Sequence, residues 1–177
     1  MSTRLPLLRD DQVGPPELVA TMRARRGGRL LELDRLLLHS PAVAAGWGEL
    51  MGRVRTGLDL SPKLRELAMC GVAALCGADY EMFHHAPLYL KAGGSELQLA
   101  ALRRLGEGTA SDPVFDAEQQ AVLAVVVEMT RNVAVSDATF ARARSVLGSD
   151  QLMFELVSVI AAYNMVARIL VAMNLRP

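Results

Sequence analysis

Apolar residues recur every three or four positions along most of this chain, which is the spacing of one face of an α-helix. Glycine, proline, serine and aspartate interrupt the pattern, and no segment has the strict alternation typical of a half-buried strand. The pattern therefore predicts an all-α protein. The expected helices are residues 17–25, 29–38, 42–55, 63–76, 80–92, 96–105, 116–132, 137–147 and 151–173.

The breaks between these segments carry helix-capping residues. Ser61 and Pro62 are suited to the start of a helix, and Gly77 is suited to its end. Asp79 is expected to cap the following helix, and Asp150 is expected to cap the last one. A single long helix with an irregularity at Gly77 is the other possibility.

The length and composition fit one packed domain. The 177 residues are 51% apolar but only 5% aromatic, and Ala, Leu and Val supply the bulk, which favours closely packed helices. We expect a single domain over residues 1–177, with residues 1–14 as a flexible lead-in. Nineteen basic residues balance nineteen acidic ones, which removes the electrostatic footprint of a nucleic-acid binder.

Neither a leader nor a membrane span is expected. Residues 1–12 contain charges and no apolar core of a signal peptide. The most apolar segment, residues 153–175, is interrupted by Glu155, Asn164 and Arg168, so it is interpreted as a buried helix. With only two cysteines, the chain is predicted to be cytoplasmic.

Several predicted helices are apolar on more than one face, notably residues 67–76, 121–129 and 156–173. In a chain of this size, such helices often bury a second face against another subunit. The pattern predicts a homo-oligomer.

The candidate chemistry is concentrated in residues 61–93, which hold both cysteines and two of the three histidines. Glu81 precedes His84 by three positions and His85 by four, so a carboxylate could orient an imidazole within one helix. Glu66 lies in a mostly apolar run, where it is either buried and functional or exposed and paired with Lys63. For the two histidines, the alternative to catalysis is that one faces solvent and the other the core.

Metal and dithiol chemistry are both disfavoured. Glu-x-x-His occurs once, whereas di-iron bundles use two copies with further carboxylates, and His39 is isolated, so no metal site is expected. Cys70 and Cys76 lie roughly 120° apart around one helix. They are interpreted as structural thiols rather than a redox pair.

Residues 66–93 resemble the core motif of the carboxymuconolactone decarboxylase and alkylhydroperoxidase D (AhpD) superfamily. The peroxidase branch of that superfamily has a glutamate, then Cys-x-x-Cys, then three residues and a histidine, then an alanine-rich helix to a glycine. Aligning His85 with the histidine places Glu66 on the glutamate and Gly93 on the glycine. The two cysteine positions are then Ala78 and Glu81, so the dithiol is missing.

The resemblance is stronger to the decarboxylase-like branch, where a Tyr-Glu pair precedes the histidine as Tyr80 and Glu81 do here. Residues 39–47 and 163–168 also resemble that branch, so the likeness extends over about residues 35–175. It implies an AhpD-like bundle of about seven to eight helices, assembled as a trimer or hexamer. It also implies that no metal or organic cofactor is needed.

The implied activity is acid/base chemistry on a small conjugated or cyclic carboxylic acid or lactone. His85 would be the acid/base, oriented by Glu81 or Glu66, and Tyr80 would donate a hydrogen bond to the developing oxyanion. Arg168 would hold the substrate carboxylate, with an ion pair to Glu155 or Glu66 as the alternative.

Three further side chains are weaker candidates. His84 and Tyr163 are assigned to substrate binding, although Tyr163 could simply satisfy buried backbone groups. Trp47 is interpreted as a core residue rather than a substrate platform.

Two rival functions remain open. The first is a peroxidase that works through one thiol, Cys76 or Cys70, with an external thiol as resolver. The second is a non-catalytic helical oligomer that binds a small molecule or a partner.

Overall fold

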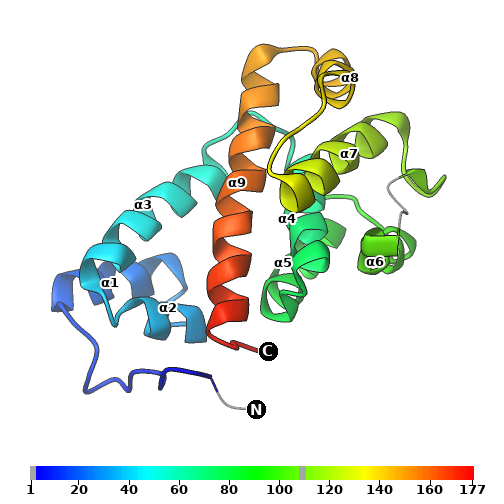
Figure 1. The fold of residues 1–177 in the computed structure, drawn as a ribbon. Helices are drawn as coiled ribbons and strands as arrows, with labels where there is room; N and C mark the ends of the chain where they lie inside the picture. Colours follow the sequence, from blue (N-terminus) through cyan, green and yellow to red (C-terminus); the bar gives the residue numbers. More distant parts are fainter. Residues whose placement is uncertain (1–2, 108–110) are drawn as a thin grey trace. The chain divides into compact units, whose positions relative to one another are not determined.

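The computed structural model describes residues 3–107 and 111–177, and over these residues it contains helices and no strand (Figure 1). This confirms the predicted all-α class. Nine α-helices are described, one or two more than the resemblance implies. They are α1 (Pro16–Arg25), α2 (Glu32–Leu37), α3 (Pro41–Thr56), α4 (Pro62–Cys76), α5 (Asp79–Lys91), α6 (Glu96–Arg103), α7 (Ala117–Asn132), α8 (Asp137–Leu147) and α9 (Asp150–Ala172), with a 3₁₀ turn at Leu105–Glu107.

The chain forms two compact units, and the prediction of a single domain stays a prediction. Unit 1 comprises residues up to 57 together with 172–176, and unit 2 comprises residues 58–171 with Pro177. In unit 1, α3 buries Trp47, Met51 and Val54, which recur at the spacing of one helix face. The apolar face of α3 is therefore part of the core of unit 1.

Residues 3–15 of unit 1 contain no helix, and side chains of Arg35 on α2 and of His39 just after it anchor this lead-in. Arg35 donates hydrogen bonds to the carbonyl of Leu8 and to Asp10, both at 2.8 Å. His39 Nε2 lies 2.8 Å from the carbonyl oxygen of Pro6. The flexibility expected of residues 1–14 stays a prediction, but these contacts fix where the segment runs.

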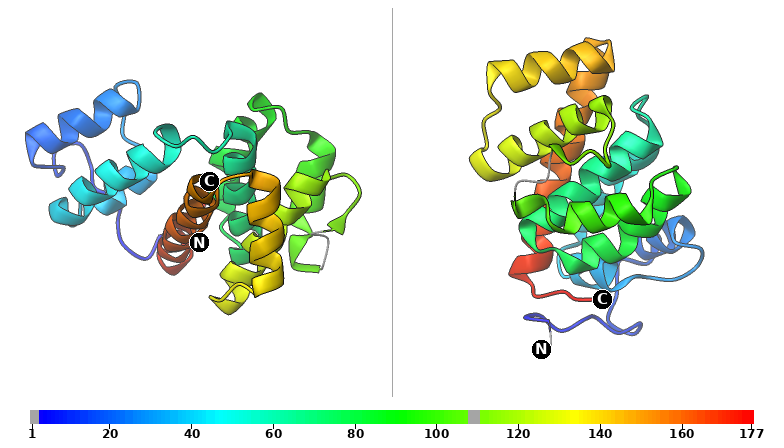
Figure 2. Two further views of the ribbon diagram at one scale, coloured as in Figure 1. Left: turned by 90° about the horizontal axis from the view of Figure 1, so that it is seen from above. Right: turned by 90° about the vertical axis from the view of Figure 1, so that its right-hand side faces the viewer.

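Unit 2 is organised around α4, which contacts α5, α6 and α7, while α8 packs on α7 (Figures 1 and 2). Residues 66–73 of α4 are all buried, which requires small residues where neighbouring helices approach closely. Gly71 is such a point, because a Cβ atom there would lie 3.0 Å from Cγ1 of Val126 on α7. Central position and small residues together make α4 the core of the unit.

The sequence prediction at the junction of α4 and α5 is right about the break and wrong about the second cap. Ser61 caps α4 by accepting from the backbone N–H of Leu64, and Gly77 ends it with a φ of 64°, a conformation that glycine adopts without strain. The cap of α5 is Ala78, and Asp79 is its first helical residue. The chain starts a new helix directly after the glycine turn. The carboxylate of Asp79 therefore lies in the first turn of α5, where it interacts favourably with the positive end of the helix dipole.

The last helix, α9, has the composition of a membrane span and the packing of a core helix. It is the one helix in the described ranges that is long and apolar enough to cross a bilayer, yet 56% of that window is buried inside the protein. Its start is also corrected: Asp150 lies within the helix, and the hydroxyl of Ser149 accepts from the N–H of Leu152 at 3.1 Å. Buried Glu155 accepts a 2.7 Å hydrogen bond from the N–H of Leu60, as expected within a protein core.

Candidate active site

Glu66 and His85 meet across the interface of α4 and α5. Nδ1 of His85 lies 2.7 Å from Oε2 of Glu66, and both residues are buried, with 7% of each exposed. A carboxylate oxygen can only accept here, so Nδ1 carries the hydrogen of this bond. Glu66 therefore fixes both the ring orientation and the tautomer, and in the neutral ring Nε2 carries the lone pair that can accept a hydrogen bond or a proton.

Tyr163 on α9 occupies the other ring nitrogen. Its hydroxyl lies 3.1 Å from Nε2 of His85, and the two rings meet edge to face with centroids 4.9 Å apart. With Nδ1–H donated to Glu66, the Tyr163 hydroxyl donates to the Nε2 lone pair. The imidazole is thus held between an anionic acceptor and a phenolic hydroxyl, and three helices each supply one member of the cluster.

The Glu66–His85–Tyr163 arrangement can move a proton. When Nε2 takes up a proton, positive charge appears on an imidazole that already touches a carboxylate, and that carboxylate stabilises the charge. The water-poor surroundings strengthen the interaction. Chemically, this cluster is an oriented acid/base with a hydroxyl next to its reactive nitrogen.

Glu81, Tyr80 and His84 lie beside this cluster on α5. Glu81 is buried, but both ring nitrogens of His85 already have partners in Glu66 and Tyr163, so Glu66 and not Glu81 orients the imidazole. Tyr80 is buried and packs edge to face on the ring of His84, with centroids 4.5 Å apart. The roles predicted for Tyr80 as oxyanion donor and for His84 in substrate binding stay predictions.

Arg168 is exposed on α9, and its side chain is anchored locally. Its Nη1 donates to the carbonyl oxygen and the side-chain Oδ1 of Asn164, at 3.1 and 2.8 Å. Glu66 is bonded to His85, and Glu155 to the backbone of Leu60, so the alternative of an ion pair between Arg168 and either glutamate is wrong. An exposed guanidinium is instead placed where a ligand could reach it.

Both cysteines are free thiols in environments that oppose ionisation. Burial raises the pKa of Cys70 well above its usual range, and the carboxylates of Glu66 and Glu81 raise it further. Cys76 is half-buried, and its pKa is raised by burial and by Glu81, with a smaller opposing influence from Arg168. The thiolate needed for peroxide attack is therefore scarce at both positions near neutral pH.

Within residues 3–107 and 111–177, no three His, Cys, Asp or Glu side chains gather in a way that could hold a metal ion.

Trp47, interpreted from the sequence as a core residue, is 8% exposed in unit 1.

The contact between Tyr163 and His85 spans 78 positions of sequence, and no local spacing could reveal it. Two signals in the sequence pointed to Tyr163 without naming its partner: residues 163–168 resemble the decarboxylase-like branch, and a polar aromatic residue inside the most apolar helix needs a partner for its hydroxyl.

Residues 41–117 match the model of the carboxymuconolactone decarboxylase family. The matched segment includes Glu66, Glu81 and His85, and it ends before Tyr163. The resemblance inferred from the sequence is thereby confirmed over residues 41–117. No curated protein matches the chain.

Solved structures of AhpD-like proteins share the fold. A protein of unknown function from Agrobacterium tumefaciens, described as a candidate AhpD antioxidant defence protein, is 21% identical with a TM-score of 0.70, over 78% of this chain and 93% of that one. An uncharacterised peroxidase-related protein from Silicibacter sp. TM1040 is 21% identical with a TM-score of 0.76, over 99% of this chain and 91% of that one. A variant of the debrominase Bmp8, bound to 2,3,4-tribromopyrrole, is 16% identical with a TM-score of 0.77, over 98% of this chain and 91% of that one.

Proposed function

We propose that this protein is a cofactor-free enzyme of the decarboxylase-like kind that uses His85 as an acid/base on a small conjugated or cyclic carboxylic acid or lactone. The observation that carries the proposal is the imidazole bonded to Glu66 at Nδ1 and to Tyr163 at Nε2, at 2.7 and 3.1 Å. The family match over residues 41–117 supports an enzymatic role without choosing the reaction.

In a decarboxylation, the bond from carbon to the substrate carboxylate breaks, and carbon dioxide leaves. The electron pair of that bond moves into the conjugated carbonyl and forms an enolate. Protonated His85 then returns one proton from Nε2 to carbon, either directly or through the Tyr163 hydroxyl, and water restores the proton to the imidazole. Tyr80 is proposed to donate to the enolate oxygen, and Arg168 to hold the carboxylate before it leaves.

A panel of unsaturated carboxylic acids and lactones, followed by proton NMR in deuterium oxide, tests this proposal. Decarboxylation gives carbon dioxide and a product with one deuterium at the former carboxyl-bearing carbon or at a conjugated position. Isomerisation gives a deuterated product of unchanged mass apart from the label. Complete absence of turnover across the panel, by folded protein, would count against the proposal.

Cys76→Ser and Cys70→Ser are expected to leave this turnover within about twofold of wild type, because neither thiol is needed for proton transfer. Reaction of wild-type protein with hydrogen peroxide should be slower than that of free cysteine at pH 7. It should accelerate as the pH rises toward the raised thiol pKa values, since only the thiolate attacks. Stopped-flow peroxide consumption checks this, and fast thiol-dependent turnover that Cys76→Ser abolishes would favour the single-thiol peroxidase instead.

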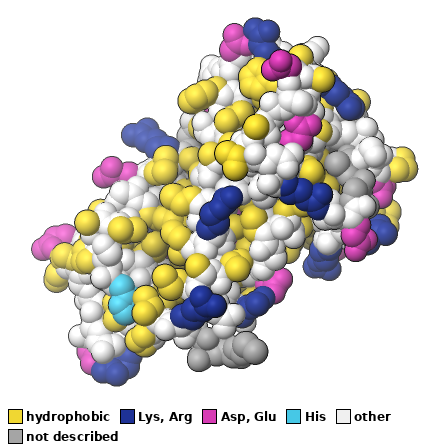
Figure 3. Space-filling model, in the orientation of Figure 1, with side chains coloured by type: hydrophobic (Ala, Val, Ile, Leu, Met, Phe, Trp, Pro, Cys, Tyr) yellow, Lys and Arg dark blue, Asp and Glu magenta, His cyan; other side chains and the backbone are white. Residues whose placement is uncertain are grey.

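The enzyme is proposed to act as a trimer or hexamer. Large apolar side chains are exposed in unit 2, including Phe83 at 60%, Leu88 at 46% and Phe154 at 73%. Hydrophobic side chains come to the surface over the N-terminal half of α9 (Figure 3). Size-exclusion chromatography with light scattering is expected to give the mass of three or six subunits at micromolar concentration. A monomer under these conditions would contradict the assembly.

A further inference from the structure

The polar residues that follow Tyr163 on α9 form a second set of hydrogen bonds, which ends at Arg168. Asn164 is buried, with 6% of it exposed. Its Nδ2 donates to Oγ1 of Thr130 on α7 and to the carbonyl oxygen of Ile160, both at 3.0 Å. Its Oδ1 accepts from Nη1 of Arg168 at 2.8 Å. One buried amide therefore connects a hydroxyl of α7 to an exposed guanidinium of α9.

This position needs an asparagine. The carbonyl of Ile160 can only accept a hydrogen bond and the guanidinium of Arg168 can only donate one, so the side chain between them must donate on one side and accept on the other. An ionised aspartate has no donor, and leucine has neither group. The requirement accounts for a buried amide inside the most apolar helix of the chain, since each of its polar groups has a partner.

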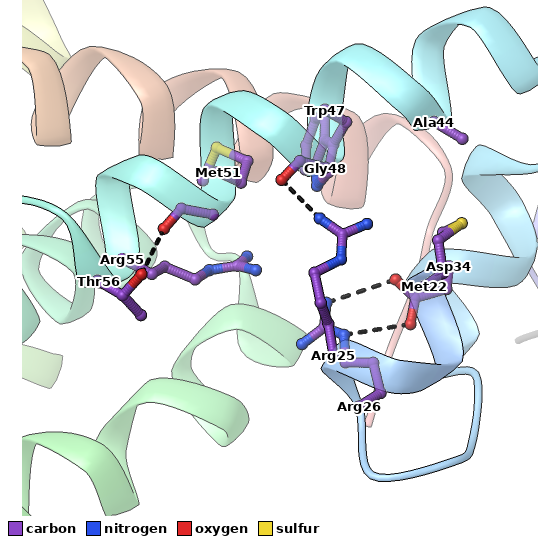
Figure 4. A pocket seen from close by; sticks show the side chains of 11 residues that line it. Met22, Arg25, Arg26, Asp34, Ala44, Trp47, Gly48, Met51, Arg55 and Thr56 are labelled. Atoms are coloured by element: carbon purple, nitrogen blue, oxygen red, sulfur yellow. Dashed lines mark hydrogen bonds and ion pairs between the residues drawn. The ribbon is translucent and has the colours of Figure 1, made fainter. Parts of the chain in front are cut away.

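The hydrogen bonds of Arg168 do not join one helix to another. Its Nη1 donates to the carbonyl oxygen of Asn164 at 3.1 Å as well as to Oδ1, and both acceptors lie one turn earlier on the same helix. Arg25 in unit 1 is different, because Figure 4 shows its guanidinium reaching from α1 to α3, where Nη1 donates to the carbonyl oxygen of Gly48 at 2.6 Å. Arg25 links two helices, whereas the contacts with Asn164 fix only the direction of the Arg168 side chain.

The opposite edge of the Arg168 guanidinium is left for a ligand. Nη1 carries two hydrogens and has two acceptors, and the hydrogen bonds of Arg168 to described residues do not involve Nε or Nη2. The N–H groups of these two nitrogens are parallel and match the two oxygens of a carboxylate. Both partners of Nη1 are neutral, so the positive charge of the guanidinium is not cancelled.

The charge of Arg168 acts on the end of α4. Burial and the carboxylate of Glu81 raise the pKa of Cys76, the last residue of that helix, and the charge of Arg168 opposes them. Helix α4 also carries Glu66. The guanidinium is therefore within electrostatic reach of the helix that orients the imidazole.

We propose that Asn164 is a positioning residue for substrate binding: it holds Arg168 so that Nε and Nη2 receive the substrate carboxylate, and it thereby sets a preference for anions over neutral analogues. The proposal rests on the proposed function, in which Arg168 binds the carboxylate, and it adds the residue that directs this arginine. Thr130 supports Asn164 from α7 in the same arrangement.

Sorbate, a small conjugated carboxylate, and its neutral amide, sorbamide, are the probes, and isothermal titration calorimetry measures their binding. Wild-type protein is expected to bind sorbate at least roughly tenfold more tightly than sorbamide, because the carboxylate gains charge-assisted hydrogen bonds from Arg168. Asn164→Leu should weaken sorbate binding roughly tenfold and leave sorbamide binding unchanged. Binding is measured without turnover, so a failure of the acid/base chemistry does not alter this result and is distinguished from a failure of the positioning role.

A double-mutant cycle with Arg168→Met separates positioning from a general structural role. Arg168→Met removes the charge and should remove the preference for sorbate. In that background, Asn164→Leu should cause no further weakening, since no guanidinium remains to be directed. Thr130→Val removes one acceptor of the amide and should cause a smaller loss of sorbate binding alone. It takes the place of Asn164→Leu if that variant does not fold.

Asn132→Leu is the matched control, because Asn132 is an exposed asparagine at the end of α7, and it should leave the binding of both probes unchanged. The proposal is overturned if wild-type protein does not bind sorbate measurably or binds both probes equally. It is also overturned if Asn164→Leu leaves sorbate binding unchanged, weakens the binding of both probes alike, or weakens sorbate binding as much in the Arg168→Met background as in wild type.

Discussion

His85→Gln is expected to lower the turnover of a decarboxylated or isomerised substrate by roughly 10²- to 10⁴-fold, the usual contribution of a positioned acid/base. Glutamine can still accept or donate a hydrogen bond in the space between Glu66 and Tyr163, but it cannot carry a proton at pH 7. The loss should therefore appear in kcat, with KM little changed, because the imidazole acts on the transition state more than on the bound substrate. Steady-state kinetics with the substrate found by the NMR panel measures it.

Two further variants separate the roles of the neighbours of His85. Glu66→Gln keeps the shape of the side chain and removes the charge that stabilises the protonated ring, so a large loss of kcat is expected. Tyr163→Phe removes the hydroxyl that is bonded to Nε2 of His85. Its loss of kcat should be smaller than that of His85→Gln if the proton passes directly to the substrate, and equally large if the proton passes through Tyr163. The comparison distinguishes the two proton routes.

His39→Gln is the control for these changes, because His39 lies in unit 1 with its Nε2 bonded to the carbonyl of Pro6. It should keep full activity. Circular dichroism and thermal unfolding of each variant establish that the fold is retained. Full activity in folded His85→Gln would remove the acid/base assignment and leave the binding or thiol functions to be tested.

The helices were largely predictable because their limits depend on local chemistry. Ser61 and Gly77 cap and end α4 as expected, since a serine hydroxyl and a glycine at positive φ act within a few residues. The errors were equally local: aspartate was favoured as a cap at 79 and 150, whereas the chain uses Ala78 and the hydroxyl of Ser149. Limits set by turns of this kind can shift by one residue at little cost.

The partner of His85 was only half predictable. Spacing along one helix pointed to Glu81, four residues earlier, and the motif pointed to Glu66, nineteen residues earlier. Packing of α5 against α4 decided in favour of Glu66, and packing of α9 added Tyr163. Such contacts depend on how helices dock, and helix periodicity says which face is buried without saying which residue of another helix it meets.

Gln98→Leu is expected to produce the largest loss of stability among single polar substitutions in unit 2, about 3 kcal/mol of unfolding free energy. Gln98 is buried, and its Oε1 accepts from the hydroxyl of Tyr89 at 2.7 Å and from the N–H of Ser95 at 3.2 Å. Its Nε2 donates to the carbonyl of Val114 at 3.1 Å and to Oε1 of Gln119 at 3.0 Å. Leucine has a similar size but leaves several of these groups buried and unsatisfied. Urea denaturation measures the change.

A double-mutant cycle with Tyr89→Phe tests whether the cost arises from unsatisfied groups. Burial raises the pKa of Tyr89 well above its usual range, so its hydroxyl stays a neutral donor that needs an acceptor. Tyr89→Phe alone should lower the unfolding free energy by about 1 kcal/mol. The double variant should lose about 1 kcal/mol less than the sum of the losses of the two single variants, because no hydroxyl is then left unpaired.

Gln151→Leu is the control for this cycle, since Gln151 is exposed and water can replace its partners; it should change stability by less than about 1 kcal/mol. Strict additivity of Tyr89→Phe and Gln98→Leu would mean that the two side chains stabilise the protein independently. The buried network would then not be the link that joins α5, which carries His85, to α6 and the start of α7.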